Sequence, residues 1–314
     1  MNINGHHHIS MITKDAKRNN AFYTKVLGLR RVNMTVNQDS PNMYHLFYGD
    51  RTGAPGTELT FFEIPNAGQT HKGTNSISRI GLFVPTVESL DYWKERFTQF
   101  GVAFQEEVTQ YANKTALHFH DHEMLEMVLL VVPENTVLPA HWEAWEKSDV
   151  PQQHRILGMA SVELKVRNPK ATVELLHDIF GYEVVAQQGN ETIIQTRSGG
   201  VLSEIVLIEE DGPAEKPGRG SVHHVAIRVE NVEQLQKYDE LLKARRIGTS
   251  SVVDRHYFES VYFRDANNIL FELATDEPGF TIAGDIETLG EKLHLPPKFE
   301  HRRQEIEAML APLD

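Results

Sequence analysis

The sequence contains no cysteine, and this absence removes a whole set of chemistries. Without thiols the chain can form no disulfide, no thiolate metal site and no cysteine nucleophile, so histidine, aspartate and glutamate are the only strong metal ligands left. No apolar run approaches the roughly 20 residues that span a bilayer, and the first residues lack the basic and apolar layout of a signal peptide. A cytoplasmic protein without a membrane partner is therefore expected.

Positive charge is also scarce. Lysine and arginine number 31 against 44 aspartates and glutamates, which gives a formal net charge of −13, and no block of basic residues stands out. Nucleic-acid binding is therefore disfavoured, because it concentrates basic residues on one face. One residue type is abundant instead, since the 314 residues include 16 histidines, partly in clusters. These clusters are the first candidates for a functional site.

The chain consists of four similar segments. Each begins with an alternating apolar strand, continues with a helix whose apolar residues recur every three to four positions, and ends with further strand-like runs. The helices are expected at residues 15–27, 86–100, 168–180 and 231–244, and each is followed by a terminating glycine, namely Gly28, Gly101, Gly181 and Gly248. This order predicts four βαβββ modules and an α+β fold.

A long polar connector separates the second module from the third. It predicts an N-terminal domain at residues 1–140, a linker at 141–156 and a C-terminal domain at 157–275, with two modules in each domain. The remaining residues, 276–314, are expected to form a structural tail with a capping helix over 300–310.

These modules, together with particular residues, are similar to a known superfamily. Four βαβββ modules with a histidine opening a first strand and a glutamate in a last strand resemble the vicinal oxygen chelate superfamily over the whole chain. The features that further resemble its hydroquinone-type ring-cleaving dioxygenases are the pairs His7-His8 and His223-His224, Arg255, the runs 260–265 and 271–276, and the tail 278–280. The resemblance implies two tandem vicinal-oxygen-chelate domains and a non-haem Fe(II) enzyme that cleaves a small hydroquinone- or catechol-type aromatic with O2.

Three residues are candidate metal ligands. When the first strands of the modules are aligned, the position before the first apolar residue holds His8, Arg79, Ser161 and His224, so only modules one and four offer a ligand there. Only module four also has an unambiguous internal carboxylate in its last strand, Glu272. Two imidazoles and one carboxylate form the arrangement of non-haem Fe(II) oxygenases, and Mn(II) could occupy the same ligands. In the family this site pairs modules one and four, which implies that these modules lie together.

The resemblance also implies which residues surround the substrate. His7, His223 and Tyr262 correspond to residues that move protons, and Arg255 to a catalytic and substrate-binding residue that holds an oxyanion. Ser10 and Phe280 are expected to contact the substrate.

Strand parity tests part of this arrangement. Ser10 lies two residues after His8 and therefore on the same strand face. Tyr262 shares a face with Glu272 only if the loop between their strands has an odd number of residues, for example 265–269.

Structural roles for these residues stay open. Tyr262 could be an ordinary strand aromatic, Arg255 could form a surface ion pair, and Glu272 could pair with Arg264. A competing cluster, His118, His120 and His122, alternates along one expected strand and could bind a second metal, although Arg79 would repel a cation there. Glu63 and Glu126, in analogous last strands, are interpreted as vestigial ligands.

Other functions on the same fold also stay open. A glyoxalase-type isomerase or thiol transferase would normally require a fourth protein ligand, and a non-catalytic protein that binds an aromatic or an antibiotic would usually lack the metal triad. The sequence leaves undecided the ring substrate and whether the chain forms a homo-oligomer.

Overall fold

The computed structural model describes residues 2–313, and its helices and strands follow the order of four modules. Module one contains β1 (His6–Thr13), α1 (Ala16–Ala21), a π-helical turn (Phe22–Val26), β2 (Arg30–Asn37), β3 (Ser40–Gly49) and β4 (Glu58–Glu63). Module two contains β5 (Ser76–Val84), α2 (Val87–Phe100), β6 (Thr109–Tyr111), β7 (Lys114–His120) and β8 (Glu126–Val131). Module three contains β9 (Gly158–Val166), α3 (Pro169–Phe180), β10 (Tyr182–Gln188), β11 (Glu191–Thr196) and β12 (Ile205–Glu209). Module four contains β13 (Ser221–Val229), α4 (Val232–Ala244), β14 (Val253–Asp254), β15 (Phe258–Arg264) and β16 (Leu270–Pro278). The predicted βαβββ modules and α+β fold are confirmed.

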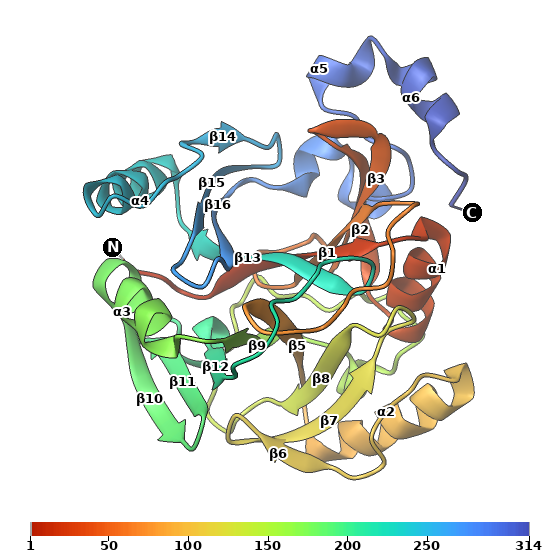
Figure 1. The fold of residues 1–314 in the computed structure, drawn as a ribbon. Helices are drawn as coiled ribbons and strands as arrows, with labels where there is room; N and C mark the ends of the chain where they lie inside the picture. The colour runs from red at the N-terminus through yellow and green to blue at the C-terminus, as the bar shows by residue number, and fades with distance from the viewer. Residues whose placement is uncertain (1, 314) are drawn as a thin grey trace.

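The strands form two eight-stranded sheets, and each sheet joins modules from both halves of the chain (Figure 1). One has the order β14-β15-β16-β13-β1-β4-β3-β2 and combines modules one and four. The other has the order β10-β11-β12-β9-β5-β8-β7-β6 and combines modules two and three. The boundary predicted at 141–156 therefore does not separate the sheets, because the antiparallel pairs β1–β13 and β5–β9 join strands across it.

Three of the four predicted terminating glycines are confirmed. Gly28, Gly101 and Gly181 have φ values of 69°, 66° and 73°, in the left-handed region that glycine adopts readily. The fourth helix, α4, ends at Ala244 as predicted, but Gly248 does not terminate it, because Arg246, with φ 61°, takes the left-handed conformation first. The helix predicted at 15–27 is an α-helix only to Ala21 and continues as the π-helical turn.

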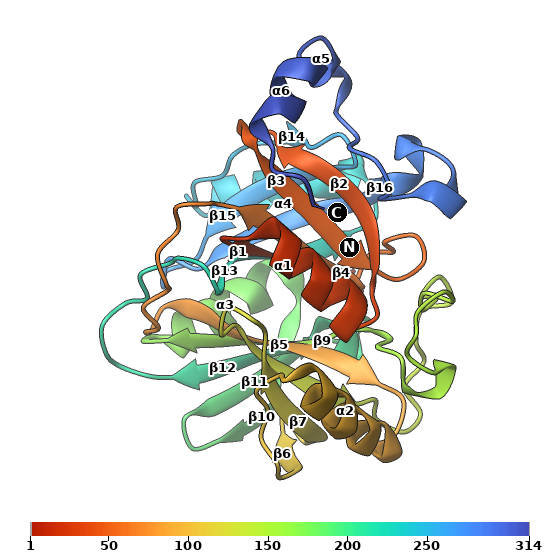
Figure 2. The same cartoon turned by 90° about the vertical axis from the view of Figure 1, so that its right-hand side faces the viewer.

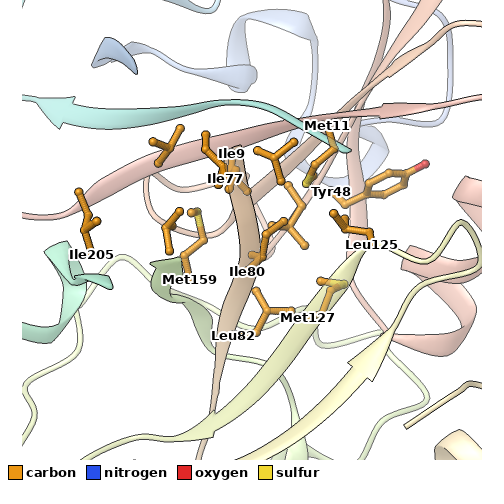
Figure 3. Packing of buried hydrophobic residues seen from close by; sticks show 14 of the residues in the cluster. Ile9, Met11, Tyr48, Ile77, Ile80, Leu82, Leu125, Met127, Met159 and Ile205 are labelled. Atoms are coloured by element: carbon orange, nitrogen blue, oxygen red, sulfur yellow. The ribbon is translucent and has the colours of Figure 1, made fainter. Parts of the chain in front are cut away.

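A hydrophobic core fills the space between the sheets (Figure 3). Ile9 and Met11 of β1 belong to the same buried cluster as Ile80 and Leu82 of β5, and all four are at most 1% exposed. Successive strand residues point to opposite faces. The even-numbered residues that follow His6 in β1 therefore face the other side of the first sheet, where the functional groups lie.

The C-terminal tail packs on the first sheet near β2 and β3 (Figure 2). It contains α5 (Pro297–Glu300) and α6 (Arg303–Met309), so the predicted capping helix begins three residues later than expected. Ile306 of α6 is fully buried against Val36 and Leu295. Within residues 2–313 no helix is long and apolar enough to cross a membrane.

Candidate metal centre

The three predicted ligands meet on one face of the first sheet, although they come from three strands. His8 lies in β1, His224 in β13 and Glu272 in β16, and all are at most 3% exposed. The Nε2 atoms of the two histidines are 3.4 Å apart. Glu272 Oε2 lies 2.7 Å from His224 Nε2 and 3.2 Å from His8 Nε2. Two imidazole nitrogens and one carboxylate oxygen thus converge on one point.

Strand register brings these residues together. The antiparallel β1–β13 pair places Ser10 opposite His224, and the parallel β13–β16 pair places Glu272 beside Ala226. Tyr262 lies directly opposite Glu272 in the β15–β16 hairpin. The loop between them runs over 265–269, so the predicted odd-numbered loop and the shared face are confirmed.

The environment of Glu272 fits a bound cation. Its Oε1 accepts a hydrogen bond from the Ser260 hydroxyl, whereas its fully buried Oε2 has no hydrogen-bond partner among the described residues. Burial alone would raise the pKa of Glu272, but His8 and His224 outweigh it and hold the pKa well below its ordinary value. A buried carboxylate anion requires a compensating positive charge. A divalent metal held by Nε2, Nε2 and Oε2 would supply that charge.

Each candidate histidine ligand contacts the histidine before it. His7 Nδ1 lies 3.0 Å from His8 Nδ1, and His223 Nδ1 lies 2.7 Å from His224 Nδ1. The outer histidines differ in their surroundings, because His223 is exposed and His7 is only 2% exposed. Burial, followed by the positive charge that His8 can carry, holds the pKa of His7 well below its ordinary value, so its imidazole is neutral.

A cavity of about 320 Å³ opens beside the three converging ligands. Four of the residues expected around a substrate line it, namely Ser10, His223, Arg255 and Tyr262. His7 does not line this cavity, and it faces a second one on the opposite side of the strand, together with Glu58. Because successive strand residues point to opposite faces, the His7 side chain leaves β1 on the face opposite to that of His8. His7 therefore does not reach the cavity in which its expected proton transfer would take place.

Phe280 also lies outside the cavity, contrary to expectation. Its ring packs 5.0 Å from the ring of Phe47 and 5.1 Å from that of Tyr257, and both of these residues line the cavity. Phe280 is 2% exposed. It therefore supports the cavity wall from behind.

Arg255 and Tyr262 form a hydrogen-bonded pair at the cavity wall. Arg255 Nε donates to the Tyr262 hydroxyl at 3.2 Å, and the guanidinium carbon lies 5.1 Å from the centre of the tyrosine ring. Arg255 also forms an ion pair with the exposed Asp39 at 3.2 Å. Burial, with the charge of Glu272, raises the pKa of Tyr262 well above its ordinary value. Tyr262 therefore keeps its proton at neutral pH.

Several residues beside the candidate ligands or at the cavity wall were missed by the sequence analysis, among them Thr60, His45 and Ser260. Thr60 Oγ1 lies 2.7 Å from Ser10 Oγ and 3.0 Å from His45 Nε2. The strand register pairs Thr60 with Ser10, which follows His8 by two residues. It pairs Glu272 with Ala226, which follows His224 by two residues. Thr60 is therefore the counterpart of Glu272 in module one. Parity could have identified Ser260, which lies two residues before Tyr262 on the same strand face.

The second sheet lacks a corresponding cluster of ligands. In that sheet the strand positions that correspond to Glu272 hold valines. Val128 pairs with Gly81, and Val206 pairs with Glu163. The interpretation of Glu63 and Glu126 as vestigial ligands is therefore wrong, because neither occupies the corresponding register position.

An ion pair occupies the place of the ligands in that sheet. Arg79 bonds to Glu163 at 2.7 Å and to Glu126 at 2.9 Å. Burial, with Arg79 nearby, lowers the pKa of His118 to about 4. His122 lies beyond the end of β7 and does not continue the predicted alternation.

Only two groups of three potential ligands occur within residues 2–313. One is the cluster described above, and the other is His7, His8 and Glu58. Neither group includes a histidine from 118–122.

Comparisons with known proteins agree with this architecture. A protein named "Putative ring-cleaving dioxygenase MhqA" from Bacillus subtilis is 46% identical over the full length of both chains. The chlorohydroquinone/hydroquinone 1,2-dioxygenase of Sphingobium indicum is 28% identical and aligns with 97% of this chain and 95% of its own. The crystal structure of a "putative dioxygenase" from Bacillus subtilis matches with a TM-score of 0.92 at 32% identity, covering 100% of this chain and 98% of that one.

The family comparison recovers both halves of the chain. The model of the Glyoxalase/Bleomycin resistance protein/Dioxygenase superfamily matches residues 5–127 and 158–273, and each stretch covers most of two βαβββ modules. The expected resemblance is thereby confirmed. The chain belongs to the Glyoxalase/Bleomycin resistance protein/Dioxygenase superfamily.

Proposed function

We propose that this chain is a ring-cleaving dioxygenase that opens hydroquinone-type aromatic rings with O2, using a non-haem Fe(II) ion held by His8, His224 and Glu272. The observation that carries the proposal is the unpartnered, buried Oε2 of Glu272, which faces two imidazole Nε2 atoms beside a cavity. Two histidines and one carboxylate leave coordination positions open for substrate and dioxygen. The names of the relatives support the same reaction.

The metal supplies the Lewis acidity that lowers the pKa of a phenolic hydroxyl and the redox capacity that dioxygen chemistry requires. Mn(II) fits the same ligands. The protein's own groups then have separate tasks. Phe62 and Phe258 line the cavity with aromatic surface, which holds an aromatic ring and excludes water.

Charge and protons are handled at the cavity wall. Arg255 would hold the oxyanion of the ionised substrate, because its guanidinium reaches the cavity beside Tyr262. The exposed imidazole of His223 would accept the phenolic proton as the substrate enters. Tyr262, which keeps its proton at neutral pH, would donate that proton to an oxygen of the opening ring.

A glyoxalase-type isomerase is the second candidate on this fold, and Thr60 argues against it. A fourth protein ligand related to Glu272 by the repeat would have to come from position 60. Position 60 holds a threonine whose hydroxyl is already bonded to Ser10 and His45. The open position favours a reaction in which substrate and dioxygen both approach the metal.

The test is anaerobic reconstitution with Fe(II), followed by an oxygen-electrode assay with hydroquinone, methylhydroquinone and catechol. We expect oxygen uptake with loss of aromatic absorbance, abolished in His8→Ala and Glu272→Ala. The matched control is His118→Ala, in the second sheet, which should retain the activity. Stoichiometric iron without oxygen uptake would refute a dioxygenase and favour an isomerase or a binding protein.

A further inference from the structure

His7 is the one candidate catalytic residue that is buried away from the substrate cavity, and its two ring nitrogens both have partners. Its Nε2 lies 3.1 Å from the backbone carbonyl oxygen of Thr275, and its Nδ1 lies 3.0 Å from His8 Nδ1. The β1–β13 register shifts between His6 and Ile9, and such an irregularity re-aims side chains. The shift allows His7 to link β1 to β16, the strand that carries Glu272.

The chemistry of these contacts fixes the position of each proton. A carbonyl oxygen can only accept a hydrogen bond, so Nε2 of His7 must carry a hydrogen and donate it to Thr275. A neutral imidazole has one N–H, which leaves His7 Nδ1 as an acceptor. The contact of 3.0 Å then requires His8 Nδ1 to be the donor. The lone pair of a neutral His8 is consequently on Nε2, which lies 3.2 Å from Glu272 Oε2.

We propose that His7 is a positioning residue that holds His8 in its Nδ1–H tautomer, so that Nε2 is ready to bind a metal. This inference rests on the proposed metal centre and replaces the proton-transfer role expected for His7. An imidazole that ligates a metal commonly donates its other N–H to a fixed acceptor, and that bond sets the ring's tautomer and orientation. Here the acceptor is a second imidazole, itself fixed by the backbone of β16.

The second histidine pair shows that this arrangement is specific to His8. His223 and His224 make the same Nδ1 contact at 2.7 Å. However, no hydrogen bond within residues 2–313 fixes His223 Nε2, and His223 is exposed at the cavity. His223 can therefore change its proton position when a substrate binds, whereas His7 is held by Thr275. The two outer histidines, His7 and His223, thus differ in function despite their similar sequence.

The experiment measures Mn(II) binding by the electron paramagnetic resonance signal of the free ion. In His7→Leu the acceptor for His8 is lost, and we expect Mn(II) affinity to fall about 10- to 100-fold. In His7→Asn, Oδ1 can replace Nδ1 as the acceptor, so most of the affinity should return. The matched control is His6→Leu, which removes a buried imidazole–carbonyl bond of the same strand, between His6 Nε2 and Glu204. It should bind Mn(II) as the wild type does.

A spectroscopic measurement separates positioning from a general loss of structure. In Zn(II)-loaded protein labelled with 15N-histidine, His7 should show a protonated Nε2 and an unprotonated Nδ1, and His8 a protonated Nδ1. Protonated Nδ1 in His7, or equal Mn(II) affinity in wild type and His7→Leu, would overturn the inference. Wild-type protein that binds no Mn(II) would instead refute the metal centre itself, and the inference with it.

Discussion

The substitution Glu272→Gln isolates the contribution of the single anionic ligand. Glutamine has the shape of glutamate and can still accept the hydrogen bond from the Ser260 hydroxyl. The charge that would hold a divalent cation between His8 and His224 is lost. The variant should therefore fold, with an apo melting temperature within about 3 °C of the wild type, because a histidine can lose its proton once the carboxylate is gone, so that no uncompensated charge stays buried.

The effect of the metal on stability can be worked out. At a free Mn(II) concentration 100 times the Kd, binding adds about 2.7 kcal/mol to the free energy of unfolding. An unfolding entropy of about 2.1 cal/mol/K per residue gives roughly 0.66 kcal/mol/K for this chain of 314 residues. We therefore expect the wild-type melting temperature to rise by about 4 °C, and that of Glu272→Gln not to rise.

Differential scanning calorimetry at pH 7.5 measures both melting temperatures. The matched control is Glu126→Gln, which removes a carboxylate of the second sheet that is paired with Lys72 and Arg79. Its melting temperature should rise with Mn(II) as that of the wild type does. A full rise in Glu272→Gln, or an equal loss in both variants, would refute the assignment of the ligands.

Three further predictions test Tyr262 as the proton donor, the buried His6 of β1 and the ion pair between Arg79 and Glu163 in the second sheet. Tyr262→Phe removes the hydroxyl beside Arg255, so kcat for ring cleavage should fall about 100-fold or more at unchanged metal content; an unchanged kcat would exclude Tyr262 as the donor. Burial lowers the pKa of His6 to about 4, so the unfolded chain binds more protons between pH 4 and 6.5 and the folded protein loses stability as the pH falls through that range. Urea unfolding at pH 7 and pH 5 should show that His6→Gln reduces this loss by roughly 2 kcal/mol, and the same loss in both proteins would contradict it. Arg79→Met leaves the buried Glu163 without its cation and should lower the free energy of unfolding by about 3 kcal/mol, while Mn(II) affinity measured on the same sample stays unchanged.

The elements that carry local signals could be predicted from the sequence. Asp15, Asn168 and Asn231 precede three of the helices, and each accepts a hydrogen bond from the backbone of the first turn. The repeat made the ligand positions visible, because His8 and His224 occupy the same place in two modules. Parity sufficed for Tyr262, since the odd loop 265–269 decides which face its side chain occupies.

Long-range pairing was beyond local signals. Nothing in the order of residues says that β1 pairs with β13 rather than with β5, and only the family resemblance implied that modules one and four lie together. The position of His7 depends on the irregular register between His6 and Ile9, which the alternating pattern does not reveal. Phe280 was misplaced because its packing against Phe47 depends on how the tail folds back.

The two sheets show how the same framework neutralises buried acids in different ways. In the second sheet Arg79, the counterpart of His8, brings a permanent cation to Glu163 and Glu126. In the first sheet two imidazoles take the place of that cation, and Oε2 of Glu272 has no hydrogen-bond partner within residues 2–313. An unpaired buried carboxylate is costly, so the proposed metal ion would supply the charge that this site lacks. The difference between the structural ion pair and the proposed metal centre therefore depends chiefly on whether the first strand supplies an arginine or a histidine.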